Sequence, residues 1–519
     1  MNTGQQPSPP DIAQAGSRSP VPPAGTHGHA PLAVTVVGAS GDLATRKIFP
    51  ALFALHARGL LPAETRLFGF ARRPWSDDDF RRHLTPGLKC EELAADVCDL
   101  RQRDFLPRCH FVPGDYDSAD SFRDLQRRLE AACGSPVHHL VYFAIPPTLF
   151  GRVAQAMRAA GIVTDGESPW TRVVVEKPFG TDRRSSDELT RLLGGCFREE
   201  QTYRIDHYLG KEVIQNLMVL RFANTIFEPL WNRRHIHHVH IAWSEDIPLA
   251  GRAGYFEGTG IIRDVMQNHL TQILALVAME CPWQLDARHV RDEKVRLLRQ
   301  VVPLTRERTV LGQYVAGRLQ GEPVAGYREE PGVAPDSCTA TYAAAVFDVR
   351  SPRWRGVPFL VSAAKGTGTR HTEIRIHFRA PDNDLFHALL AKGAAGQGLL
   401  RGNELVIRVQ PDEQILMRVV SKVPGSGFQL DTAALDLSYR EAYAGTRIGD
   451  AYENLILDVL RGDRSLFIRN DELEAAWDLF TPLLMELDTC RQTPHPYPFG
   501  TPGPEARREL AARYAIEDA

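Results

Sequence analysis

The sequence predicts two domains of different fold class, an α/β domain with a doubly wound parallel sheet and a larger α+β domain with a mostly antiparallel sheet. Three observations support this prediction. The chain has 519 residues, which is too long for one ordinary domain. Strand and helix patterns alternate from Leu32 to about residue 205. Beyond that point, long helical patterns precede a cluster of strand patterns.

Residues 1–30 lie outside both predicted domains. Pro, Gly, Ser and Gln recur there and apolar residues are few, so we expect this extension to be disordered. It lacks the apolar core of a secretory signal, and its single basic residue, Arg18, makes a poor transit peptide. We therefore expect a disordered extension at 1–30, a first domain at 31–205 and a second domain at 206–519.

The first domain begins with Leu32–Val37, a β-branched apolar run that predicts a buried strand. Gly38-Ala-Ser-Gly-Asp-Leu-Ala-Thr45 follows at once, and residues 48–55 have a helical pattern. A strand, a glycine turn and a helix form the context in which backbone amides bind a pyrophosphate. The spacing is Gly-x-x-Gly-x-x-Ala, which an ordinary left-handed turn also produces. The context favours a Rossmann dinucleotide-binding domain.

The next strand pattern, Arg66–Ala71, ends at two arginines, Arg72 and Arg73. In a dinucleotide-binding fold the end of the second strand meets the adenosine ribose, where an acidic residue favours NAD and an arginine accommodates the 2′-phosphate of NADP. The first acidic residue after the strand is Asp77. The pattern therefore favours NADP, although two arginines on a loop are also compatible with simple exposure.

Another apolar run, residues 172–175, ends at Glu176-Lys-Pro178. Proline stops the strand, and ligands in open α/β sheets lie beyond the carboxyl ends of the strands. Lys177 is therefore placed where it can touch both cofactor and substrate. The alternative is a buried structural pair between Lys177 and Glu176.

Arg204-Ile-Asp-His-Tyr-Leu-Gly-Lys-Glu212 is the most informative stretch of the chain. If it is helical, His207 and Lys211 are four residues apart and share one face, an arrangement that suits a phosphate. Tyr208 adds a neutral donor, and Asp206 points elsewhere to orient another group. The alternative is a solvated, charged helix.

In the second domain, strand patterns recur close together, as expected for an antiparallel sheet. They cover residues 237–243, 340–349, 373–378, 405–410 and 415–421.

Together these segments resemble the glucose-6-phosphate dehydrogenase family. The resemblance runs in order from about Leu32 to about Leu510. The 204–212 stretch is highly specific to this family, whereas Glu-Lys-Pro is shared more widely among two-domain dinucleotide oxidoreductases. Other matching stretches are Ala144-Ile-Pro-Pro147, Gly260-Ile-Ile-Arg-Asp-Val-Met-Gln-Asn-His-Leu270, Arg291-Asp-Glu-Lys294, Arg408-Val-Gln-Pro411 and Asp450-Ala-Tyr-Glu453.

The resemblance implies oxidation of D-glucose 6-phosphate at C1 to 6-phospho-D-glucono-1,5-lactone with hydride transfer to NADP. This is the first step of the oxidative pentose phosphate pathway. Two alternatives stay open at this point. One is a dehydrogenase of another sugar phosphate, because phosphate contacts do not identify the sugar. The other is a non-catalytic NADP-binding regulatory protein.

The resemblance also implies the catalytic residues. His269 aligns with the proton acceptor of the family, Asp206 with the residue that orients it, and Lys177 with a residue that bridges cofactor and substrate. His269 lies in a helical pattern over residues 261–279, where a histidine on an apolar stripe is otherwise a core residue. Asp264, five residues earlier, should point about 140° away along an ideal α-helix, so we expect it to contact substrate hydroxyls instead.

The remaining site residues come from the same resemblance. The pyrophosphate is expected to contact Gly38, Ala39, Ser40, Gly41, Asp42, Leu43, Ala44 and Thr45. Arg72 is expected to contact the 2′-phosphate, and Lys177 is a further expected cofactor contact. Substrate contacts are expected from Lys177, His207, Tyr208, Lys211, Glu245, Asp264, Lys365, Arg370 and Gln410. Thr45 stands where some members have lysine. Some members also bind a second, structural NADP and have lysine where His371 stands, so we do not predict that second site here.

Composition limits the other classes of function. The formal net charge of −3 does not indicate nucleic-acid binding, and no apolar run is long enough to span a membrane. The eight cysteines show neither Cys-x-x-Cys pairs nor metal-ligand spacing, so we expect reduced thiols, a cytoplasmic protein and no metal. The family assembles through its larger sheet, which implies a homodimer or homotetramer.

Overall fold

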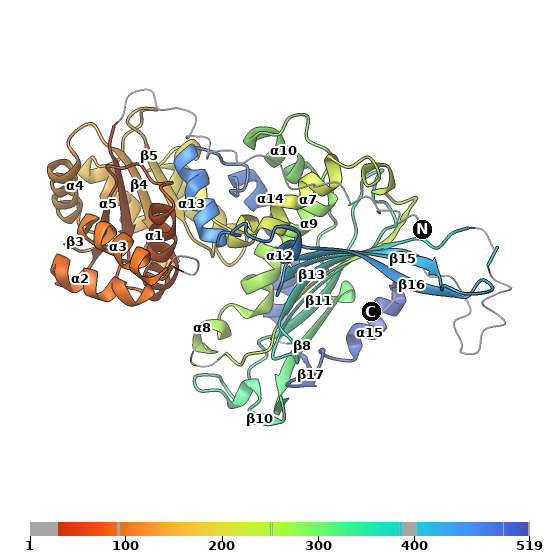
Figure 1. Cartoon of the computed structure of the whole chain (residues 1–519). Coiled ribbons are helices and arrows are strands. Elements are labelled where there is room, and N and C mark those ends of the chain that lie inside the picture. The colour runs from red at the N-terminus through yellow and green to blue at the C-terminus, as the bar shows by residue number, and fades with distance from the viewer. Residues whose placement is uncertain are drawn as a thin grey trace, which may run out of the picture.

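The computed structural model describes residues 30–90, 94–249, 251, 253–382, 385–386, 402–490 and 492–516. The disorder predicted for residues 1–30 falls outside this part of the chain, apart from Ala30. Two lobes are visible, a small one with a short sheet and a larger one with a long sheet (Figure 1). The predicted sequence of an α/β domain and then a larger α+β domain is confirmed.

The small lobe contains a six-stranded sheet in the order β3-β2-β1-β4-β5-β6, and every neighbouring pair is parallel. This is the strand order of a Rossmann fold, with its reversal point beside β1. The strands are β1 (Leu32–Val37), β2 (Arg66–Ala71), β3 (Cys109–Pro113), β4 (His138–Phe143), β5 (Thr171–Val175) and β6 (Thr202–Arg204). The strands predicted at β1 and β2 have the expected bounds.

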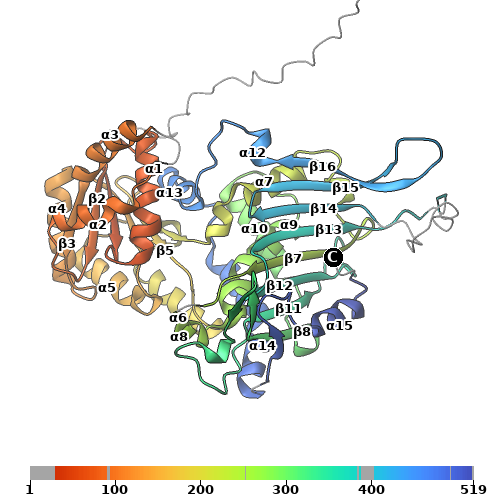
Figure 2. The same ribbon diagram turned by 60° about the horizontal axis from the view of Figure 1, so that its bottom comes forward.

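Helices cover both faces of this sheet, with α1 and α3 on one face and α4 and α5 on the other (Figures 1 and 2). Their bounds are α1 (Phe49–Ala57), α2 (Asp77–Leu84), α3 (Ala95–Phe105), α4 (Ala119–Cys133), α5 (Phe150–Ala160) and α6 (Arg183–Gly194). All six residues of β1 are buried. Burial on both faces explains why this strand is a continuous apolar run.

The large lobe contains a nine-stranded sheet in the order β16-β15-β14-β13-β7-β12-β11-β8-β17. Only the β7–β12 and β8–β17 pairs of this sheet are parallel. Its strands are β7 (Ile236–Glu245), β8 (Thr309–Val315), β11 (Tyr342–Phe347), β12 (Phe359–Lys365), β13 (His371–Phe378), β14 (Glu404–Gln410), β15 (Gln414–Lys422), β16 (Leu430–Ser438) and β17 (His495–Pro498). A separate hairpin pairs β9 (Gly317–Leu319) with β10 (Glu322–Val324). The mostly antiparallel sheet is therefore confirmed.

Helices α7, α9 and α10 lie on one face of the large sheet, whereas α15 lies against the other face near β8 (Figures 1 and 2). The helices of this part are α7 (Glu212–Phe222), α8 (Ala253–Glu257), α9 (Thr271–Ala278), α10 (Ala287–Leu298), α12 (Tyr439–Ala442), α13 (Ala451–Arg461), α14 (Asn470–Cys490) and α15 (Ala506–Arg513). Among the described residues, no helix is both long enough and apolar enough to cross a membrane.

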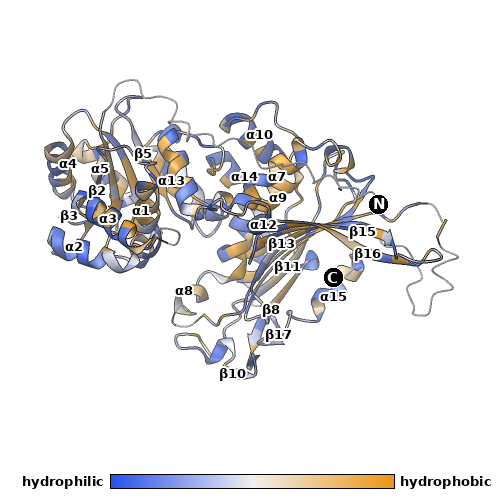
Figure 3. Cartoon of the chain, viewed as in Figure 1, coloured by the Kyte–Doolittle hydropathy of each residue, from blue (hydrophilic) through white to orange (hydrophobic). Residues whose placement is uncertain are grey.

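Strand β13, which lies next to the central strand β7, shows why the large sheet has one apolar face. Ile374, Ile376 and Phe378 are buried, whereas the residues between them are partly exposed. Side chains of a strand alternate between the two faces, so this pattern places the apolar set on one side. In Figure 3 hydrophobic residues are concentrated in the strands and in α7 and α9.

Helix α13 connects the two lobes, although it comes late in the chain. Asp450, which caps it, lies 3.1 Å from Nζ of Lys47, and Glu453 lies 3.4 Å from a guanidinium nitrogen of Arg58. At the other end of the helix, Arg172 donates to the carbonyl of Val459 at 2.6 Å. Helix α13 is thus bound to the small lobe by these contacts. The domain boundary after residue 205 stays a prediction.

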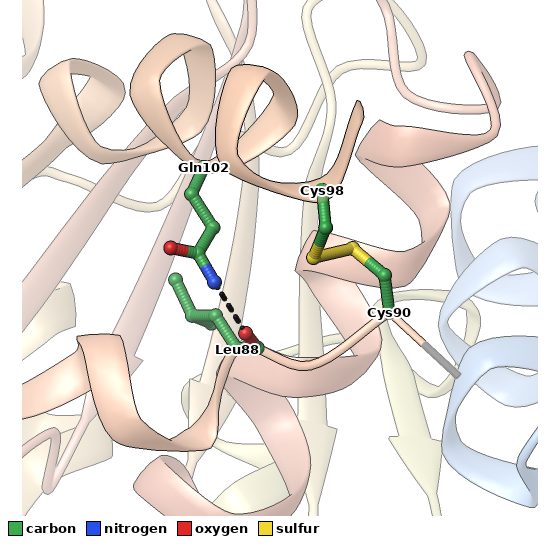
Figure 4. The surroundings of a disulfide bond; sticks show 4 residues. All are labelled: Leu88, Cys90, Cys98 and Gln102. Atoms are coloured by element: carbon green, nitrogen blue, oxygen red, sulfur yellow. Dashed lines mark hydrogen bonds between the residues drawn. A yellow bond between two sulfur atoms is a disulfide. The ribbon is translucent and has the colours of Figure 1, made fainter. Parts of the chain in front are cut away.

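Cys90 and Cys98 form a disulfide that joins the segment before α3 to the first turn of that helix (Figure 4). Nearby, the side-chain amide of Gln102 donates to the carbonyl of Leu88 at 2.7 Å. The expectation that all cysteines are reduced is therefore wrong for this pair. The sequence contained no signal for it, because two cysteines eight residues apart match no common spacing pattern.

Candidate active site

The centre of the candidate site is a buried pair, Asp206 and His269. Asp206 follows β6 and caps the short helix η6 (His207–Gly210), where it accepts a hydrogen bond from the amide of Tyr208 at 3.0 Å. Nδ1 of His269 lies 2.5 Å from Oδ1 of the same carboxylate. Asp206 is 1% exposed and His269 is 3% exposed. The structure therefore brings together the predicted base and its predicted partner.

His269 lies in a π-helix, η8 (Ile262–Leu270), which runs directly into α9 (Thr271–Ala278). The expectation of one regular α-helix over residues 261–279 is therefore wrong in detail. In a π-helix residue i bonds residue i+5, so residues five apart lie nearly one above the other. Asp264 is consequently not turned 140° away from His269, and its charge raises the pKa of that imidazole.

The protonation states of the pair follow from burial and charge. Burial lowers the pKa of His269 below its usual value, and the charge of Asp206 opposes this only in part. Burial favours a neutral Asp206, but the adjacent imidazole outweighs it and lowers the pKa of Asp206 to about 2. An ionised carboxylate only accepts hydrogen bonds, so Nδ1 of His269 must be the donor. Near neutral pH, Nε2 of His269 therefore carries a free lone pair.

A second cluster alternates lysines and carboxylates. Nζ of Lys177 donates to the carbonyl of Asp264 at 2.7 Å and lies 3.4 Å from its carboxylate. Nζ of Lys365 lies 2.9 Å from Glu245 and 3.3 Å from Asp264. Burial raises the pKa of Asp264, but the charges of Lys177 and Lys365 more than offset this and hold it below its usual value. Such a set of fixed donors and acceptors suits the hydroxyl groups of a sugar.

Strand pairing positions this cluster. Lys365 is the last residue of β12 and Glu245 the last residue of β7, and the two are direct partners in a parallel pair. Gln410 likewise ends β14. Three predicted substrate residues thus come from strand ends of the large sheet.

The stretch that carries His207 and Lys211 is not the regular helix considered from the sequence. Residues His207–Gly210 form a 3-10 turn, and Lys211 has an extended backbone before α7 begins. The helical-face argument for these two residues is therefore wrong. They still share one region, because Nζ of Lys211 lies 5.5 Å from the ring centre of Tyr208, whose other neighbours include His207 at 5.0 Å.

His207 and Lys211 give this region its charge properties. Burial, with the nearby His269, lowers the pKa of His207 well below its usual value. Burial also lowers the pKa of Lys211; the carboxylates of Glu413 and Asp450 oppose this, whereas the charges of Arg370 and Lys47 add to it. Arg370 itself is exposed. Cations that repel one another in a partly buried region are favourable neighbours for a dianion.

Tyr208 packs its ring on His269, with ring centres 4.5 Å apart. Its hydroxyl accepts hydrogen bonds from Trp243 at 2.6 Å and from Gln410 at 3.2 Å. Burial raises the pKa of Tyr208 to about 12, so it stays neutral. The sequence did not single out Trp243, and no local pattern indicated that it would support this phenol.

The glycine loop after β1 fits a dinucleotide. Gly38 has a φ of +91°, and a Cβ there would lie 2.3 Å from the carbonyl oxygen of Ala144, so only glycine fits without strain. Thr45 donates its amide to the carbonyl of Gly41 at 3.2 Å, so a helical segment starts directly after Gly41. The first amides of a helix have no partner within it and are available to phosphate oxygens. This segment contains a second π-helix, η1 (Ala44–Ile48).

Arg72 is exposed at the end of β2, with its guanidinium carbon 5.3 Å from the ring centre of Tyr116. Asp77, the first acidic residue after this strand, is occupied elsewhere. Its carboxylate accepts from the amide of Phe111 at 2.7 Å and lies 3.0 Å from Nδ1 of His110. The strand therefore ends at an exposed cation, and the first carboxylate after it in the sequence is engaged elsewhere, which fits a 2′-phosphate.

Asp206, His207 and His269 also offer ligand atoms within 4.8 Å of one another, as a metal site would. Because Asp206 and Nδ1 of His269 are bonded to each other, we interpret this group as proton-transfer machinery.

Comparison with known proteins agrees with this geometry. The model of the glucose-6-phosphate dehydrogenase NAD binding domain matches residues 35–216, and that of the C-terminal domain matches residues 218–517. The chain belongs to the glucose-6-phosphate dehydrogenase family. The recognition made from the sequence is confirmed.

Individual members of the family are similar over almost the whole chain. Glucose-6-phosphate 1-dehydrogenase 1, chloroplastic, from Arabidopsis thaliana is 47% identical over 95% of this chain and 84% of its own length. A cytoplasmic relative from the same plant is 43% identical, covering 92% and 90%. A solved structure of glucose-6-phosphate dehydrogenase in complex with its substrate glucose-6-phosphate is 38% identical, with a TM-score of 0.86, covering 94% and 98%.

Proposed function

We propose that the protein oxidises D-glucose 6-phosphate at C1 to 6-phospho-D-glucono-1,5-lactone with NADP as hydride acceptor, in the first step of the oxidative pentose phosphate pathway. Membership of the glucose-6-phosphate dehydrogenase family supports the reaction. The observation that carries the mechanism is the buried pair of a neutral His269 and an ionised Asp206.

In this proposal Nε2 of His269 accepts the proton of the C1 hydroxyl. The imidazolium that forms is stabilised by the carboxylate of Asp206, which also holds the ring in the correct tautomer. NADP supplies the hydride acceptor when it is bound. Nζ of Lys177 is held at the carbonyl of Asp264, and this residue is assigned to orient both ligands.

The proposed substrate contacts divide by chemistry. His207, Lys211 and Arg370 are assigned to the phosphate, to which Lys211 and Arg370 bring positive charge and the neutral His207 brings a hydrogen-bond donor. Hydroxyl groups of the sugar are assigned to Glu245, Asp264, Lys365, Gln410 and Tyr208. Because Lys365 pairs with both Glu245 and Asp264, these groups are held in place before substrate arrives.

The proposed cofactor contacts are the loop from Gly38 to Thr45 for the pyrophosphate and Arg72 for the 2′-phosphate. The fit rests on Gly38, which no other residue can replace without strain, and on the bonds that hold the carboxylate of Asp77 at β3. The same features favour NADP over NAD.

One assay tests the reaction and its alternatives. Purified protein is mixed with glucose 6-phosphate and either NADP or NAD, and reduced nicotinamide is followed by absorbance. We expect rapid reduction of NADP and slower reduction of NAD. A panel of other sugar phosphates separates the related dehydrogenases. Absence of turnover with every sugar phosphate, together with intact NADP binding, would indicate the regulatory alternative.

We also propose that the protein is a homodimer or homotetramer. Exposed apolar side chains on and between β15 and β16 support assembly through the large sheet, namely Val420, Phe428, Leu435 and Leu437. Light scattering after size exclusion tests this, and a monomer at all working concentrations would count against it.

The proposed location is the cytoplasm. Relatives include both chloroplastic and cytoplasmic forms. The six other cysteines are free thiols, which is consistent with a reducing compartment, whereas the Cys90–Cys98 disulfide is not. Fractionation of the source cells, with thiols trapped at lysis, tests the location and the oxidation state together.

A further inference from the structure

Glu176 is a buried carboxyl group directly before Lys177, and the mechanism above gives it no part. It follows the last residue of β5 and is 8% exposed. The phenol of Tyr142, from the neighbouring strand β4, donates to Oε1 of Glu176 at 2.5 Å. The phenol of Tyr452, from α13, interacts with the same carboxyl group. The carboxyl group thus joins a strand of the small lobe to a helix from the far end of the chain.

The charged and titratable groups around Glu176 come from each element that packs on it. They are Lys177 on its own segment, Tyr142 on β4, Asp206 after β6 and Tyr452 on α13. Burial, helped by Asp206, raises the pKa of Glu176 to about 7, while the two phenols and Lys177 oppose the shift. Glu176 therefore changes its charge close to neutral pH.

Tyr452 connects Glu176 to the substrate site. Its ring lies parallel to that of His207, with an interplanar angle of 8° and ring centres 6.1 Å apart. The ring of His207 in turn lies edge-on to His269 at 4.6 Å. Tyr142 is fully buried and its phenol donates to Glu176. The two tyrosines therefore differ, because only the ring of Tyr452 lies beside His207.

We propose that Glu176 is a positioning residue for the reaction, which holds the phenol of Tyr452 and thereby fixes the ring of His207 on the phosphate side of the substrate site. The inference rests on the proposed function, because His207 is assigned there to the substrate phosphate. An ionised carboxylate accepts from both phenols at once. A protonated one offers only neutral, weaker hydrogen bonds, so its hold on the phenol of Tyr452 weakens.

The first test is Glu176→Gln, which keeps the size of the side chain but replaces one acceptor oxygen by a donor. With glucose 6-phosphate and NADP, we expect KM for the sugar phosphate to rise about 5- to 30-fold and kcat to change less than about threefold, as for loss of one buried hydrogen bond used in binding. In the wild type, KM should rise between pH 8 and pH 6. This rise should be smaller in the variant, whose residue 176 does not titrate.

A matched pair of variants keeps the proposal testable if Glu176→Gln does not fold. Tyr452→Phe retains the ring beside His207 but loses the hydroxyl that interacts with Glu176, and we expect KM to rise about fivefold or more. Tyr142→Phe removes the other phenol, which does not touch His207. Because that phenol also lowers the pKa of Glu176, the comparison is made at alkaline pH, where the carboxyl group is ionised, and KM should stay within about twofold of the wild type. Equal effects of the two variants, or an unchanged KM and pH profile in folded Glu176→Gln, would overturn the proposal. A loss confined to kcat would do the same.

A binding experiment separates this proposal from the proposed function. Calorimetric titration with glucose 6-phosphate, without cofactor, needs no turnover. If the wild type binds the sugar phosphate but does not oxidise it, the proposed reaction fails, while weaker binding by Glu176→Gln still supports a positioning role. Equal binding by the two proteins, or no binding by the wild type, overturns the positioning role.

Discussion

Nδ1 of His269 lies 2.5 Å from Oδ1 of Asp206, although 63 residues separate them in the sequence. One comes from a π-helix that packs under the large sheet, and the other from the turn that follows the last strand of the small sheet. The pair therefore exists only where the two lobes meet. Burial keeps the imidazole neutral and the adjacent imidazole keeps the carboxylate ionised, which is the state that a proton acceptor requires.

Replacing His269 tests its role as the base. His269→Ala should lower kcat by about 10²- to 10⁴-fold, as for loss of a general base, while binding of glucose 6-phosphate stays largely intact. Steady-state kinetics and calorimetry measure the two effects. His289→Ala is a matched control, because His289 also pairs with an aspartate, Asp286 at 2.8 Å, but on a partly exposed helix. Turnover near that of the control would remove His269 from the mechanism.

The fall of kcat at acid pH should reflect protonation of His269. Its folded pKa is lowered, so the neutral base persists to lower pH than for a free histidine, and kcat should fall only below about pH 6.5. The charge of Asp206 raises that pKa, so Asp206→Asn should shift the fall to still lower pH as well as reducing maximal kcat. A shift in the opposite direction would contradict the assignment. Recovery of activity after return to pH 7.5 excludes unfolding.

Arg72 should discriminate between the two cofactors. Arg72→Ala removes a charge-assisted contact, so KM for NADP should rise about 10- to 100-fold while KM for NAD changes little. Arg73→Ala provides the control, since Arg73 is the next residue but lies over Trp75, with its guanidinium carbon 5.2 Å from the ring centre. Equal losses for NADP and NAD in Arg72→Ala would mean that Arg72 does not contact the 2′-phosphate.

The disulfide should contribute to stability through the unfolded chain. Closing a loop between residues 90 and 98 restricts the unfolded state by about 2 to 3 kcal/mol. Cys98→Ser should therefore lower the free energy of unfolding in urea by up to that amount, and a reductant should destabilise the wild type but not the variant. Cys281→Ser, at an exposed free thiol, should respond to reductant as the wild type does. Insensitivity of the wild type would mean that the bond contributes nothing.

Several parts of the fold and site were predictable because their cause is local. The apolar runs at Leu32–Val37 and Arg66–Ala71 became β1 and β2 with the same bounds, since strands buried on both faces need no partner-specific pattern. The role of Gly38 was equally predictable from the sequence. The turn between strand and helix brings its backbone against Ala144, and only glycine fits there.

Other parts could not be predicted from local pattern. Over nine residues, the apolar periodicity of an α-helix and that of the π-helix Ile262–Leu270 differ too little to separate, yet the difference decides whether Asp264 faces His269. The 3-10 turn at His207–Gly210 was missed for a similar reason. The stretch Asp450-Ala-Tyr-Glu453 matches the family, but nothing near it in sequence shows that Tyr452 reaches Glu176.

By itself, the sequence determined the fold class, several strands of each sheet, the glycine turn and the family, since side-chain periodicity and short specific motifs are local properties. Tertiary structure alone decided the charge states and the partners. The pKa of Asp206 and that of Glu176 move in opposite directions from ordinary carboxyl values, to about 2 and about 7. Burial raises both, and only packing sets an imidazole beside one and two phenols beside the other.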